Sequence, residues 1–150
     1  MKKITLIILT ILLILTGCSN KEITKVYLSD EYYKDSKFIS ITANEIDNLK
    51  DDTYLLYTYN NYCTLEVPCE DIFNSFMSLY NISIKSIPFD EYKKTSFYKK
   101  VKYAPTVILI SKGKIITYLD ANNDNDLDKY QDITAFTEWL DTYIYLTNKK

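Results

Sequence analysis

The chain has 150 residues, with 18 lysines, 20 acidic residues, no arginine and no histidine, and its net charge is −2. The absence of histidine excludes Ser-His-Asp and Cys-His nucleophiles and histidine-ligated metals, so catalysis would depend on cysteine, carboxylate, tyrosine or lysine side chains. The lysines form no basic block, which argues against a nucleic-acid partner because phosphate binding needs clustered cations.

The N-terminus has the layout of a bacterial lipoprotein signal. Lys2 and Lys3 precede an apolar run at positions 4–15, and Leu-Thr-Gly-Cys follows at 15–18 as a lipobox. The run is shorter than the roughly 20 apolar residues that a membrane-spanning helix needs. It therefore predicts a cleavable signal peptide rather than a transmembrane helix.

The resemblance to bacterial lipoproteins implies that residues 1–17 are removed and that Cys18 becomes a lipidated N-terminus. Its sulfur is then a thioether outside redox chemistry, and two acyl chains supply a stable membrane anchor. Loss of two lysines brings the net charge to −4. We expect a tether over 18–37 and one monomeric domain over 38–148, at the extracytoplasmic face of the cell membrane.

After the tether, the sequence pattern predicts alternating strands and helices. Thr42 and Glu45 have the spacing of a capping box, and the aromatic and β-branched run at 53–59 is typical of a central buried strand. The expected strands lie at 38–41, 53–59, 82–87, 106–110 and 114–119, with a short edge strand at 26–28. The expected helices lie at 42–50, 70–80, 90–102 and 133–144.

Two features of this layout carry a family resemblance. Cys63 and Cys69 lie where the central strand meets the next helix, and Ala104-Pro105-Thr106 opens a later hairpin with a Lys112-Gly113 turn. With the element order, they resemble the thioredoxin fold over roughly 38–147. The resemblance implies an α/β fold, a three-layer α/β/α sandwich with a central mixed sheet. It also implies a cis Ala104–Pro105 bond and a substrate groove formed by Ala104, Pro105 and Thr106.

A cysteine at this joint has a chemical use. The partial positive charge of a helix N-terminus stabilises a thiolate, which attacks a substrate disulfide before a second cysteine resolves the mixed disulfide. The resemblance implies thiol–disulfide exchange on exported proteins without a cofactor or metal. Cys63 would attack and Cys69 would resolve, although the position of Cys69 at the helix start also allows the reverse assignment.

Several departures from the thioredoxin pattern leave a second interpretation open. The cysteines are spaced C-x5-C rather than C-x2-C, and aligning Val67-Pro68-Cys69 with the family's Gly-Pro-Cys puts Glu66 at the nucleophile position. Tyr62 replaces the usual Trp, and the strand at 53–59 contains no buried acid. The chain could instead be a non-catalytic binding or accessory lipoprotein with a structural disulfide. Its partner would then be an envelope protein, such as a component of bacteriocin export.

An acidic loop near the C-terminus resembles an EF-hand loop in part. Asp120, Asn122 and Asp124 match the first, third and fifth positions, but Asn125 replaces the required Gly and Gln131 replaces the final Glu. The loop also follows a strand rather than a helix. We therefore expect a solvated connector and no metal site.

Overall fold

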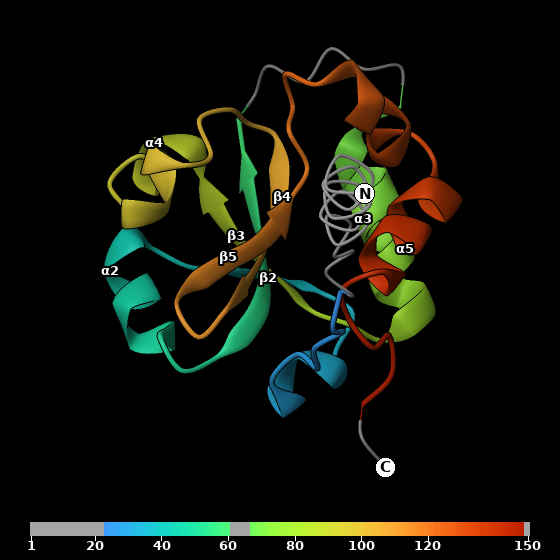
Figure 1. Cartoon of the computed structure of the whole chain (residues 1–150), viewed down its shortest axis with the longest axis horizontal. Coiled ribbons are helices and arrows are strands. Elements are labelled where there is room, and N and C mark those ends of the chain that lie inside the picture. Colours follow the sequence, from blue (N-terminus) through green and yellow to red (C-terminus); the bar gives the residue numbers. More distant parts are fainter. Residues whose placement is uncertain (1–22, 61–66, 149–150) are drawn as a thin grey trace, which may run out of the picture.

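A five-stranded mixed sheet forms the centre of the domain in the computed structural model, which describes residues 23–60 and 67–148. The strand order is β1-β3-β2-β4-β5 (Figure 1). Strands β1 and β2 are both parallel to β3, whereas β4 is antiparallel to β2 and to β5. The strands are β1 (Phe38–Ser40), β2 (Thr53–Tyr59), β3 (Ile84–Pro88), β4 (Thr106–Ser111) and β5 (Lys114–Tyr118).

Helices cover both faces of the sheet, which gives the three layers predicted from the sequence. Helices α3 (Cys69–Tyr80) and α5 (Ile133–Asp141) lie together on one face, and α2 (Ala43–Ile46) and α4 (Phe89–Tyr92) lie on the other (Figure 1). Four 3-10 helices complete the described chain: η1 (Asp30–Tyr33), η2 (Asp47–Leu49), η3 (Ser96–Lys99) and η4 (Asp124–Tyr130).

The central position of β2 explains its continuous apolar sequence. Leu55 and Leu56 are fully buried because helices cover both of their faces. The antiparallel ladder with β4 runs from Thr53 opposite Ser111 to Thr58 opposite Thr106. The end of β2, which leads toward the cysteines, therefore lies beside the start of β4, which follows Pro105.

Several local predictions are confirmed. The Glu45 carboxylate accepts the Thr42 N–H at 2.7 Å, as the capping box requires, and it also accepts the Thr42 hydroxyl at 2.7 Å. The β4–β5 hairpin turns at Lys112 and Gly113, which have φ of 49° and 69°. No helix within the described ranges is long and apolar enough to cross a bilayer.

The segment at 23–37, predicted as the end of the tether, packs against the domain instead. Val26 forms a parallel bridge with Ile144, with hydrogen bonds from Val26 N–H to Tyr143 (2.8 Å) and from Tyr145 N–H to Val26 (3.0 Å). Its apolar and aromatic side chains enter the core, where Tyr32 is 2% exposed. The predicted tether therefore does not extend through residues 23–37, and the predicted edge strand at 26–28 is reduced to this single bridge.

The helix predicted at 90–102 is also wrong. The structure has the single turn of α4, then η3, with Thr95 between them in an extended conformation (φ −83°, ψ 158°). Thr95 and Ser96 are poor helix formers, so local propensity does not hold the two turns together. The predicted loop at 120–132 contains η4, and this 3-10 helix matters for the site.

Candidate functional site

The site is built at the end of the sheet where β2 stops and β4 begins. The Ala104–Pro105 peptide bond is cis, as the resemblance implied. Both residues lie outside the β2–β4 ladder, whose last pair is Thr58 with Thr106. The Asn60 side-chain amide, just beyond β2, donates a hydrogen bond to the Ala104 carbonyl at 3.2 Å. Beyond the last pair of the ladder, a side-chain hydrogen bond from Asn60 therefore connects the two segments.

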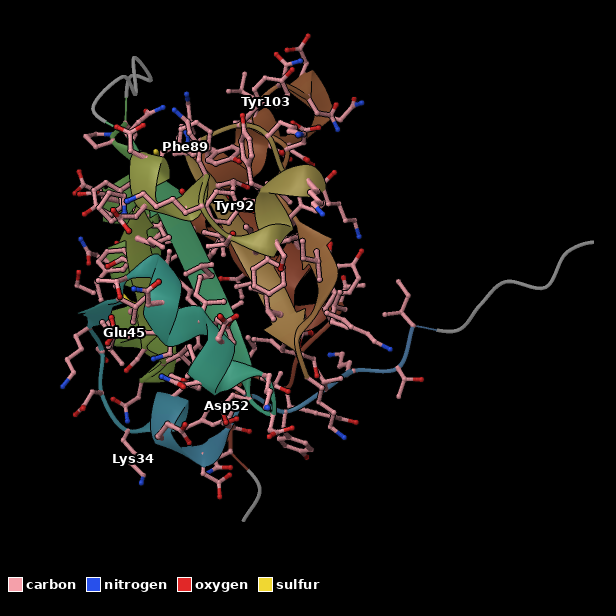
Figure 2. The ribbon with its side chains drawn as sticks, turned by 90° about the vertical axis from the view of Figure 1, so that its left-hand side faces the viewer. Lys34, Glu45, Asp52, Phe89, Tyr92 and Tyr103 are labelled. Carbon is pink, nitrogen blue, oxygen red and sulfur yellow. The ribbon has the colours of Figure 1, made fainter. Side chains whose placement is uncertain are left out.

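The three residues predicted to contact substrate do not have equal access to solvent. Ala104 and Pro105 are half-buried, whereas Thr106 is fully buried. The Thr106 hydroxyl points inward and donates to the Leu119 carbonyl. The cis-proline segment, Ala104-Pro105, is therefore the part of this stretch that faces outward, together with the half-exposed Tyr103 (Figure 2).

Cys69 is the first residue of α3 and is 1% exposed. Pro68 precedes it in an extended conformation (φ −57°, ψ 124°), and its carbonyl accepts the Asp71 N–H at 2.9 Å. Pro68 is therefore the N-cap residue and lies just outside the helix. The thiol lies at the positive end of the helix, the position that favours a thiolate.

The other cysteine lies outside the described residues, as do Tyr62 and Glu66. The bond between Cys63 and Cys69 therefore stays a prediction. The structure does place Asn60, three residues before Cys63, against Ala104. It also places Cys69 at the start of the helix that follows.

Sequence reasoning missed the buried tyrosine behind the cis-proline segment. Tyr130, the last residue of η4, is 3% exposed, and its hydroxyl donates to the Pro105 carbonyl at 2.9 Å. Burial raises the pKa of the Tyr130 phenol, the nearby Asp126 and Cys69 add to the rise, and a contact with the Thr106 hydroxyl opposes it. The phenol therefore stays protonated and remains a hydrogen-bond donor. No local motif marks it, because its role arises from chain topology.

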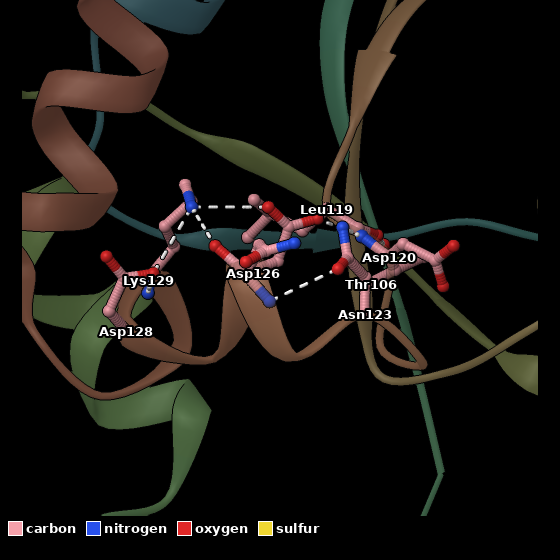
Figure 3. A network of polar contacts seen from close by, with 8 residues as sticks. Thr106, Leu119, Asp120, Asn123, Asp126, Asp128 and Lys129 are labelled. Carbon is pink, nitrogen blue, oxygen red and sulfur yellow. Dashed lines mark hydrogen bonds and ion pairs between the residues drawn. The ribbon is translucent and has the colours of Figure 1, made fainter.

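A polar network holds η4 in place next to the start of β4 (Figure 3). The Asp126 carboxylate accepts the Asp120 N–H at 2.9 Å, which closes the turn after β5. The Asn123 side chain accepts the Asn125 N–H at 3.1 Å and caps the 3-10 helix. These contacts fix the path of the chain up to Tyr130.

In the same network, two carboxylates of the loop that resembles an EF-hand, those of Asp126 and Asp128, form ion pairs with a lysine. The Lys129 ammonium lies 3.2 Å from both Asp126 and Asp128, and it donates to the Asn125 carbonyl at 2.7 Å. A cation of the chain itself therefore sits among these oxygens. In the part of the chain that the structure describes, no cluster of three or more Cys, Asp or Glu residues could hold a metal ion.

Comparisons with known proteins agree with this geometry. A family model described as the prokaryotic membrane lipoprotein lipid attachment site matches residues 1–19. The structure is similar to a mutant thioredoxin from Halobacterium salinarum NRC-1, with a TM-score of 0.55, 17% identity, and coverage of 77% of this chain and 97% of the other. It is also similar to Schistosoma mansoni thioredoxin, with a TM-score of 0.50, 18% identity, and coverage of 73% and 97%.

At these identities the structural likeness shows the fold, and the N-terminal match shows the kind of membrane attachment. The match includes Cys18, the residue predicted to carry lipid. The chain is therefore a thioredoxin-like lipoprotein, with a membrane lipid attachment site at its N-terminus.

Proposed function

We propose that this lipoprotein exchanges thiols and disulfides with exported proteins, using Cys63 and Cys69. The observation that carries the proposal is a cysteine at the start of α3, in a domain with a cis-proline segment that side chains hold in place. Asn60 approaches the segment from the end of β2, and Tyr130 approaches it near Cys69. An extended substrate could pair with the outward backbone of this segment.

The burial of Cys69 supports one assignment of roles. A thiol that is 1% exposed cannot meet a disulfide on a folded protein without a rearrangement. We therefore assign the attack to Cys63 and the resolving step to Cys69. The reverse assignment would require α3 to open at its first turn.

The reaction then has two displacements. The Cys63 thiolate attacks one sulfur of a substrate disulfide, and the other substrate sulfur leaves and takes up a proton. The Cys69 thiolate next attacks the Cys63 sulfur and releases the second substrate sulfur, which is also protonated. The substrate gains two electrons and two protons, the pair becomes a disulfide, and an exported dithiol must reduce it again. The reverse sequence oxidises a substrate dithiol.

Paired serine variants test this function. Non-reducing electrophoresis of Cys69→Ser should show mixed disulfides with partner proteins, whereas Cys63→Ser should show few. The wild type should also reduce insulin disulfides in the presence of dithiothreitol. An exchange of behaviour between the two variants would reverse the roles. Absence of both trapped partners and insulin turnover would favour the binding or accessory lipoprotein with a structural disulfide.

We further propose that residues 1–17 are cleaved and that lipid on Cys18 holds the domain at the extracytoplasmic face of the membrane. The lipid attachment match supports this proposal. Cys18→Ser should accumulate as an unprocessed precursor or move to the soluble fraction. Unchanged mass and unchanged partitioning into detergent would contradict it.

A further inference from the structure

We infer that Tyr130 is a positioning residue for disulfide exchange, because its hydroxyl fixes the Pro105 carbonyl and so orients the cis-proline segment beside Cys69. The inference rests on the proposed exchange function. It assigns a role to a residue outside the cysteine motif and outside the three residues predicted to contact substrate.

The cis-proline segment needs support that the sheet does not supply. Strand pairing with β2 ends at Thr106, so Ala104 and Pro105 lie beyond the ladder. Their two successive carbonyls are instead held by side chains, with Asn60 at 3.2 Å from the first and Tyr130 at 2.9 Å from the second. In the part of the chain that the structure describes, these two hydrogen bonds hold the segment in place of a continuous ladder.

Of the two supports, Tyr130 is the buried one, since its side chain is 3% exposed whereas Asn60 is half-buried. The Tyr130 ring packs edge-on against Phe73, with ring centroids 6.4 Å apart. Phe73 lies one turn after Cys69 on α3, so a single tyrosine connects the cysteine helix to the Pro105 carbonyl. A shift of the ring would change the placement of the segment relative to the thiol.

The chemistry of the phenol suits a fixed donor. Burial holds the pKa of Tyr130 above its ordinary range, and Asp126, Cys69 and Asp120 are the charged or titratable groups that add to this effect. The hydroxyl consequently keeps its proton, and its hydrogen bond, over the whole physiological pH range. A group that takes up and releases protons during turnover would instead need a pKa near the working pH.

Tyr130→Phe removes the hydroxyl and keeps the ring. The matched control is Tyr33→Phe, because the buried Tyr33 hydroxyl also donates to a backbone carbonyl, that of Tyr145 at 2.6 Å. Tyr33 belongs to η1, which lies near the start of β2, away from Pro105 (Figure 1). The Tyr33 hydroxyl also accepts the Leu28 N–H at 3.1 Å, so the control removes at least as much hydrogen bonding as Tyr130→Phe, at the opposite end of the domain.

The full domain with either substitution is assayed with insulin, whose chain is long enough to pair with the cis-proline segment, and with hydroxyethyl disulfide, which is too small to do so. Tyr130→Phe should raise KM for insulin about fivefold, the change that one lost hydrogen bond produces. Turnover of hydroxyethyl disulfide should stay within about twofold of the wild type. Tyr33→Phe should change neither. A purely structural role would alter both substrates equally, or only the melting temperature.

Hydrogen exchange supplies a readout that does not depend on turnover. The amides at 101–107 should exchange faster in Tyr130→Phe than in Tyr33→Phe. If the wild type is active but Tyr130→Phe changes neither the amide exchange rates nor the insulin KM, the positioning role of Tyr130 is wrong and the proposed function stands. If the wild type has no turnover with either disulfide, the proposed function falls and the catalytic meaning of Tyr130 falls with it.

Discussion

The two ends of strand β2 are built differently. At its start, backbone groups bond one another: Ser29 N–H donates to the Thr53 carbonyl and Lys112 N–H to the Asp52 carbonyl, both at 2.8 Å. At its end, the bonds that hold the backbone of Ala104 and Pro105 among the described residues come from the side chains of Asn60 and Tyr130. Figure 2 shows Asp52 at one end and Tyr103 at the other.

This difference indicates which substitutions should change activity while the fold is kept. The starting end has main-chain bonds, which almost any sequence can make, and the Ser29 hydroxyl adds a side-chain bond to the Thr53 N–H. At the end of β2, the carbonyls of the half-buried residues Ala104 and Pro105 bond to particular side chains, those of Asn60 and Tyr130. We therefore expect substitutions at the start of β2 to affect stability, and those at its end to affect activity.

The largest effect should come from the core that both ends share. Phe73 is fully buried and packs against Tyr57 and Phe136, with ring centroids 5.0 and 4.9 Å apart. Phe73→Ala should lower the free energy of unfolding by about 3–5 kcal/mol, measured by urea denaturation. Leu79→Ala on the same helix is the control, because Leu79 is 64% exposed. A loss of similar size in the control would contradict the assignment of the effect to burial of the Phe73 ring, because Ala is the better helix former at both positions.

The next effect concerns the start of β2. The Ser29 hydroxyl accepts the Thr53 N–H at 3.0 Å, so Ser29→Ala leaves a buried donor without this partner. We expect a loss of about 1–2 kcal/mol in unfolding free energy and unchanged insulin turnover. Ser78→Ala, on an exposed position of α3, should change neither quantity. Reduced insulin turnover in Ser29→Ala, at a temperature where the variant stays folded, would contradict the expectation that the start of β2 affects stability alone.

At the end of β2, we expect a substitution to change the unfolding free energy less than Ser29→Ala does, but to change the KM for insulin more. Asn60→Ala removes the bond to the Ala104 carbonyl and should cost less than about 1 kcal/mol because the site is partly solvated. It should nevertheless raise KM for insulin. Asn81→Gly removes an equivalent amide bond, to the Tyr33 carbonyl at 3.1 Å, and tolerates the φ of 53° there. The Asn81 variant should therefore keep the wild-type KM, and equal KM values in both variants would contradict the functional assignment.

The smallest effect should have the opposite sign. Tyr92 on α4 is fully buried, and its hydroxyl has no hydrogen-bond partner among the residues described. Tyr92→Phe should leave the unfolding free energy unchanged or raise it by up to about 1 kcal/mol. Tyr33→Phe, which loses the bond to the Tyr145 carbonyl and the bond from the Leu28 N–H, should lower it by about 1–3 kcal/mol. In thermal melts, the melting temperature of Tyr33→Phe should therefore fall, whereas that of Tyr92→Phe should stay the same or rise.

Local patterns predicted much of the fold. The apolar runs of β2 and β4, the Thr42–Glu45 capping box and the Lys112–Gly113 turn each depend on neighbouring residues, and each is confirmed. The cis bond at Pro105 followed from the family resemblance and is also confirmed.

Two of the misses have a common cause. Tyr130 meets Pro105 across 25 positions of sequence, and the bridge from Val26 reaches Ile144, so no window of neighbouring residues contains both partners. The break at Thr95 is different, because the poor helix formers Thr95 and Ser96 mark it locally and the apolar spacing around them concealed it. The candidate site combines both kinds of information, because its cysteines follow a local pattern whereas its supporting side chains come from topology.

The docking of Val26 against the last turn of the chain also limits how far the domain can travel. Seven residues lie between Val26 and the lipid attachment position at Cys18, so even a fully extended chain places these two residues at most about 29 Å apart. With lipid on Cys18 as proposed, the domain would sample a thin layer above the bilayer rather than the bulk solution. The proposed exchange would then favour exported chains and segments close to the membrane, because they would meet the domain at high effective concentration.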